Sequence, residues 1–137
     1  MEAGGAAFGS TGAAADMLDA SLDHLGAADW AALGTAAHGE MLARLGRAQA
    51  KLTAVHAAVL AAFTAANGYE PDGHGSARAW LIGKTGISKG AANGAVGWQR
   101  RLARHRVIAA AMTTGAFASR IAAIRLSSFG GSVGVLK

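Results

Sequence analysis

The sequence predicts an all-α protein, a helical bundle with one long helix and a C-terminal helix-turn-helix-like region. Three observations carry this prediction. Alanine, the strongest helix former, accounts for 36 of the 137 residues. There is only one proline, Pro71, and the alternation of β-branched and aromatic residues typical of strands is nowhere sustained. The length fits one domain.

The first part of the chain predicts a disordered tail followed by a short helix. Residues 1–13 are rich in Gly and Ala, so we expect them to be disordered. A short amphipathic helix is expected over residues 14–25, ended by Gly26, and a further turn over residues 29–33. The side chains expected to face inward from the helix are Met17, Leu18, Leu22 and Leu25.

The strongest helical pattern begins at Thr35, a suitable N-cap, and ends at the stop signal Asn67-Gly68. It predicts a helix of about thirty residues. Its apolar stripe, with alternating spacings of three and four, consists of Met41, Leu45, Ala48, Leu52, Val55, Val59 and Ala62. We interpret this stripe as the core face of a bundle. The alternative is a dimerisation seam, which Ala48 and Ala62 would weaken.

Turn residues from Tyr69 to Gly75 predict a loop, after which the pattern of a helix-turn-helix begins. Ser76 is expected to cap a first helix that ends at Gly86, and Ser88 a second that runs to about His105. Further helices are expected over residues 107–113 and 118–126. The prediction is thus one helical domain, 14–126, with an acidic half (14–72), a basic half (73–126) and a flexible tail, 127–137.

Charge divides the chain at Gly73. All eight carboxylates and only three cations precede it, whereas the remaining residues hold ten Lys and Arg and no acid, which gives net charges of −5 and +10. A segment without carboxylates cannot neutralise its own cations by pairing. Such a positive field favours a polyphosphate partner.

The second helix of the basic half predicts a nucleic-acid surface. On a helical projection, Ala92, Ala95, Val96, Leu102 and Ala103 share an apolar arc. A second arc carries the residues expected to bind DNA, which are Lys89, Asn93, Arg100, Arg101 and Arg104. Additional phosphate contacts are expected from Arg78, Lys84, Arg106, Arg120 and Arg125, and a weak one from His105.

The run from Leu42 to Leu52, the segments 76–81 and 85–88, and the sequence from Gly115 to Ala118 resemble the actinobacterial domain of unknown function 222, the 13E12 repeat family. That domain commonly precedes an HNH nuclease, so the resemblance implies a truncated member that lacks the HNH part. The turn and second helix are also similar to the helix-turn-helix of partition proteins of the ParB/KorB type, which implies DNA contact. Family members usually carry an acid after the cap serine, where this chain has Lys89.

No catalytic centre is expected in this chain. It has no cysteine, its five histidines do not share a metal-ligand spacing, and its serines lack a nucleophile motif. We therefore expect no metal, no cofactor and no small-molecule substrate. The uncharged stretch 52–69 is too polar for a membrane span, the start of the chain lacks a signal peptide, and the absence of cysteine fits the cytoplasm.

The favoured hypothesis is therefore a DNA-binding or DNA-associated helical module with weak sequence preference. The alternatives are a protein-interaction or oligomerisation module, with a homo-oligomer formed through the long helix, and a truncated family member without a function of its own. In the protein-interaction or oligomerisation module, the acidic half would cover the basic half and cancel its field, within one chain or across a dimer.

Overall fold

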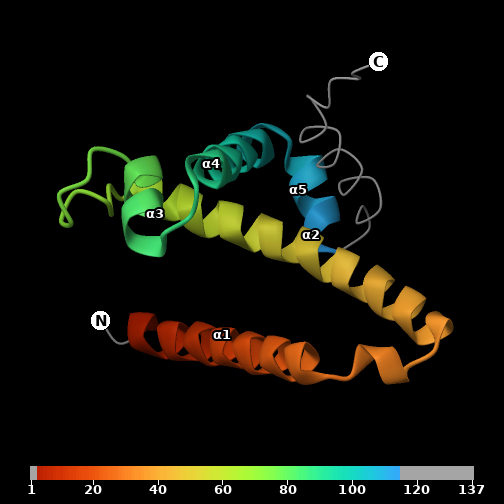
Figure 1. Cartoon of the computed structure of the whole chain (residues 1–137). Coiled ribbons are helices and arrows are strands. Elements are labelled where there is room, and N and C mark those ends of the chain that lie inside the picture. The colour runs from red at the N-terminus through yellow and green to blue at the C-terminus, as the bar shows by residue number, and fades with distance from the viewer. Residues whose placement is uncertain (1–2, 115–137) are drawn as a thin grey trace, which may run out of the picture. The chain divides into compact units, whose positions relative to one another are not determined.

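The structure, a computed structural model, describes residues 3–114, and in this range it is entirely helical with connecting turns (Figure 1). Five α-helices and one short 3-10 helix follow one another, and no strand occurs among these residues. The all-α prediction is confirmed. The chain divides into two compact units, Met1–Glu40 and Met41–Lys137, where the sequence predicted one domain. The expected helix 118–126 and tail 127–137 lie outside the described residues.

The first unit begins with a longer helix than the sequence predicted. Helix α1 spans Ala3–Ala27, so residues 3–13, for which disorder was expected, are helical. Alanine explains the extension, since its helix propensity offsets part of the cost of the interspersed glycines. Met17, Leu18 and Leu22, expected to face inward, are 71, 44 and 48% exposed. A unit of this size has too few residues to build a core around them.

A tryptophan holds the turn between the first two long helices. The 3-10 helix η1 spans Trp30–Ala32, within the turn predicted from the sequence. The Trp30 indole N–H donates a hydrogen bond of 3.0 Å to the Leu25 carbonyl, and His38 Nε2 contacts the Trp30 carbonyl oxygen. Both bonds tie the turn to its neighbouring helix ends.

The long helix α2 spans Thr35–Ala65 and ends in a Schellman motif. The Gly68 N–H donates to the Phe63 carbonyl at 3.0 Å and the Asn67 N–H to the Thr64 carbonyl at 3.1 Å, while Asn67 takes a left-handed conformation with φ of 49°. A Cβ at Gly68 would lie 2.4 Å from the Phe63 ring, so only glycine fits there without displacing it. The predicted length and stop signal are confirmed.

The face by which α2 packs is not the predicted one. Ala50, Ala57 and Leu60 are buried, whereas Leu52, Val55 and Val59 of the predicted stripe are 44, 54 and 63% exposed. Of the other stripe members, Leu45, Ala48 and Ala62 are exposed and Met41 is half-buried. The stripe is therefore not the face on which the helices of residues 77–113 pack. The residues of α2 that join the buried clusters of the short helices are Ala57 and Leu60.

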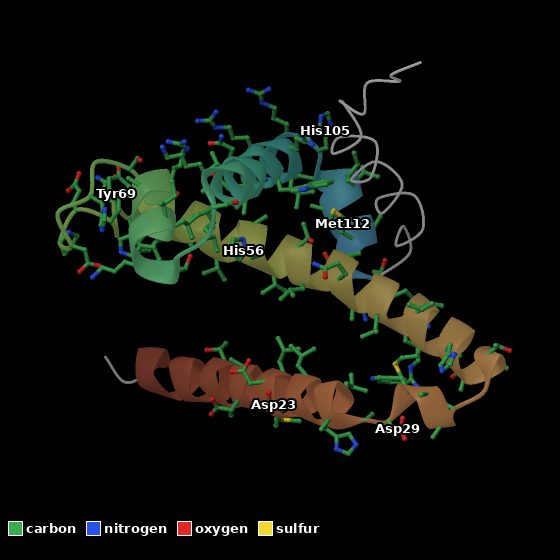
Figure 2. The ribbon with its side chains drawn as sticks, in the orientation of Figure 1. Asp23, Asp29, His56, Tyr69, His105 and Met112 are labelled. Carbon is green, nitrogen blue, oxygen red and sulfur yellow. The ribbon has the colours of Figure 1, made fainter. Side chains whose placement is uncertain are left out.

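The core of the second unit consists of two clusters along α2. One joins Leu60 of α2 to Ala77, Leu81 and Ala92, and the other joins Ala57 of α2 to Leu102 and Met112. These residues come from α3 (Ala77–Thr85), α4 (Lys89–Arg104) and α5 (Arg106–Thr113). Met112 is fully buried, and Figure 2 shows it where α5 meets α2. The α2 helix thus serves as the platform for three short helices.

Among the described residues, no helix is long and apolar enough to cross a membrane.

Candidate nucleic-acid interface

The loop before α3 is fastened to that helix by Asp72. The Trp80 indole N–H donates to the Asp72 carboxylate at 2.7 Å, and the Lys84 ammonium lies 3.4 Å from its other oxygen. The Trp80 hydrogen bond is the largest of the effects that lower the pKa of Asp72 below its usual 3.8, with the bond and charge of Lys84 and the charge of His74 contributing. The aspartate therefore stays ionised and fixes the entry into the basic half.

The connection between α3 and α4 has the layout of a helix-turn-helix. Ser76 Oγ accepts the Ala79 N–H at 3.2 Å and Ser88 Oγ accepts the Ala91 N–H at 3.1 Å, so both predicted N-caps are present. Gly86 ends α3 in the left-handed conformation with φ of 69°. Ile87 is half-buried and packs on the cluster around Leu60, which fixes the turn between the two helices.

The two faces of α4 separate largely as the sequence predicted. On the apolar face, Ala92 is fully buried between α3 and α4, Leu102 is buried, and Ala95 and Val96 are half-buried. Ala103 is exposed, which corrects its assignment to the apolar arc: at the break between α4 and α5, Leu102 is the last buried residue of α4. Figure 2 shows His105 at this junction.

The five residues predicted to bind DNA are all exposed on α4. They are Lys89, Asn93, Arg100, Arg101 and Arg104. Four of them lie within about 60° around the helix axis and Arg101 lies about 60° to one side, and the stripe is roughly 22 Å long at 1.5 Å per residue. The first turn of α4 contains no acidic residue, and Lys89 stands where the helix dipole favours an anion. The stripe is therefore positive along its whole length.

A hydrogen bond between the two helices fixes the asparagine of this stripe. Arg78 Nε, from α3, donates to the Asn93 side-chain oxygen on α4. Both side chains are exposed, and the bond leaves the two terminal nitrogens of Arg78 as further donors. The sequence placed Arg78 among the phosphate contacts but did not connect it with Asn93. No spacing rule identifies such a pair, because it forms across a turn.

Trp30, Trp80 and Trp98 are half-buried. Trp98 packs against the cluster around Leu102 with one side. The guanidinium carbon of Arg101 lies 5.5 Å from the centre of the Trp98 ring, within cation–π range. This contact limits the orientations of Arg101 and holds its charge beside the stripe.

The other cations from which phosphate contacts were expected differ in how free they are to bind a phosphate. Lys84 is bound to Asp72, so its charge is already partly neutralised. Arg106 and His105 are exposed at the junction of α4 and α5. Arg120 and Arg125 lie outside the described residues. Residues 73–114 contain seven Lys and Arg and no acidic residue. Asp72, directly before this segment, is the nearest carboxylate in sequence.

In the described part of the chain, no three His, Asp or Glu side chains gather closely enough to hold a metal ion. His74 packs over Gly83, where a Cβ would lie 2.8 Å from its ring, and His56 is exposed on α2. The structure brings the cations of α4 together and places these histidines on separate elements.

No protein-family model, curated protein or solved structure matches the chain. The resemblance to domain of unknown function 222 and its association with HNH nucleases therefore stay predictions from the sequence.

Proposed function

We propose that this chain is a DNA-binding helical module that holds the DNA backbone through the exposed face of α4. The observation that carries the proposal is the stripe of Lys89, Arg100, Arg104 and the neighbouring Arg101, exposed on the second helix of a helix-turn-helix layout. In that layout, the second helix is the one that enters the major groove. The resemblance to the 13E12 repeat family points in the same direction.

Electrostatics supports phosphate binding more than base recognition. Arginine and lysine neutralise phosphates and release counterions, which gives affinity without sequence preference. The side chain best suited to read a base is Asn93, whose amide can pair with adenine. Its oxygen already accepts a hydrogen bond from Arg78. We therefore expect weak sequence preference, with Arg78 and Asn93 acting as one positioned unit at the groove.

The test is binding of a random-sequence DNA duplex, followed by fluorescence anisotropy over a series of salt concentrations. Four neutralised phosphates predict a log–log slope of about −3.6, since each contributes about −0.9. The double variant Arg100→Ala/Arg101→Ala should reduce the slope to about −1.8. Equal binding at all salt concentrations, or none at low salt, would refute the proposal.

A matched control removes two charges elsewhere. Arg47 and Lys51 lie exposed on α2, away from the α4 stripe in sequence. The variant Arg47→Ala/Lys51→Ala has the same net charge as the α4 variant, and we expect it to keep a slope near −3.6. If both double variants lose binding equally, net charge rather than the α4 face is responsible.

A further inference from the structure

We infer that the exposed apolar stripe of α2 is the interface of an antiparallel homodimer. This inference is independent of the proposed DNA binding. It starts from the finding that α2 is apolar on two faces. The buried face, centred on Ala50 and Ala57, lies about 170° around the helix from the centre of the stripe. A helix that is apolar on both faces is normally covered on both.

The stripe has the spacing of a coiled coil. Leu45, Leu52 and Val59 occupy a positions and Met41, Ala48, Val55 and Ala62 occupy d positions, without a break over three heptads. Sustained heptads of this length are typical of helices that pair with one another. Leu42, at a flanking e position, is 70% exposed and widens the surface.

The residue sizes favour a second copy in antiparallel orientation. When the two helices run in opposite directions, each layer pairs an a residue with a d residue. Leu45 then faces the partner's Ala62, Leu52 faces the partner's Val55, and Val59 faces the partner's Ala48. Each layer combines a larger with a smaller side chain, which fills the interface evenly. A parallel pair would instead stack alanine on alanine at positions 48 and 62.

Each of these contacts occurs twice, once from each protomer. One self-complementary surface that pairs about a two-fold axis is what a closed dimer requires.

The available area predicts a dimer of modest affinity. Weighted by their exposed fractions, Leu42, Leu45, Leu52, Val55 and Val59 offer about 350 Å² of apolar surface per protomer. With the alanines and the stems of the flanking residues, two protomers approach the roughly 1,000 Å² of the smallest specific interfaces. We therefore expect a dissociation constant in the micromolar range.

Sedimentation equilibrium of the full chain over a range of concentrations tests the dimer. The mass should rise from 13.6 kDa towards twice that value. Leu52→Glu places a charge at the centre of the seam and should keep the chain monomeric, with unchanged helicity because the side chain lies on an exposed face. Ala43→Glu adds the same charge to α2 at an exposed f position and should dimerise like the unmodified chain.

Introduced cysteines test the orientation, since the chain has none of its own. A disulfide requires Cα atoms about 4.4–6.8 Å apart. In the antiparallel dimer, Ala48→Cys should cross-link only when mixed with Val59→Cys, because two copies of either variant place their cysteines about 16 Å apart along the helix. A monomer at every concentration, a Leu52→Glu dimer, or cross-linking of each variant with itself would overturn the inference.

Discussion

The orientation of α2 can be tested by truncating two adjacent residues that face opposite sides. Leu60 is 4% exposed and packs against Ala77, Leu81 and Ala92, whereas Val59 is 63% exposed. A buried Leu→Ala substitution costs about 2–5 kcal/mol. Because two of the neighbours are alanines on short helices that can partly close the cavity, we expect Leu60→Ala to lose about 2–3 kcal/mol.

The control, Val59→Ala, should change stability little. It removes a side chain that is mostly in water already, and alanine has the higher helix propensity, by up to about 0.7 kcal/mol. The two effects should cancel to within about 0.5 kcal/mol. Urea unfolding followed by far-UV circular dichroism measures both, and with a slope of roughly 1–3 kcal/mol per molar, Leu60→Ala should lower the midpoint by about 1–2 M.

Dilute protein is required, so that dissociation of a dimer does not contribute to the midpoint. If Val59→Ala destabilises the dilute protein as much as Leu60→Ala does, the helix packs by the stripe predicted from the sequence and the orientation of α2 described above is wrong. An equal midpoint for both variants and the unmodified chain would mean that neither face is packed.

Two further substitutions test the helix-turn-helix region. Ser88→Ala removes the N-cap of α4 and should cost about 1 kcal/mol in urea unfolding, whereas Ser21→Ala, which removes a bond to a carbonyl within an exposed helix, should cost nothing measurable. The pKa of Asp72 in the folded chain is lowered below its usual 3.8. The bond from Trp80 to the Asp72 carboxylate should therefore persist above pH 3.8 and be lost only as the pH falls through the lowered pKa of the folded chain. The Trp80 indole N–H resonance should follow this titration in NMR spectra and lose its pH dependence in Asp72→Asn.

The helix-turn-helix region was largely predictable because its signals are local. Ser76, Gly86 and Ser88 each act within one turn of the chain: the serine side chains accept N–H groups three residues ahead, and the glycine takes a conformation that other residues avoid. The exposed stripe of α4 follows from the same local geometry. The links from Arg78 to Asn93 and from Asp72 to Trp80 were not predictable, because they join side chains across loops whose course no periodic pattern specifies.

The packing face of α2 was mispredicted for a different reason. The prediction rested on spacing, and Leu45, Leu52, Val55 and Val59 follow the alternation of three and four residues along this helix. The short helices pack instead on Ala57 and Leu60. Both faces are apolar, and the face with Ala57 and Leu60 is the one that packs with the short helices. The larger side chains are left for a different contact, and their heptad spacing is typical of two long helices that pair with one another.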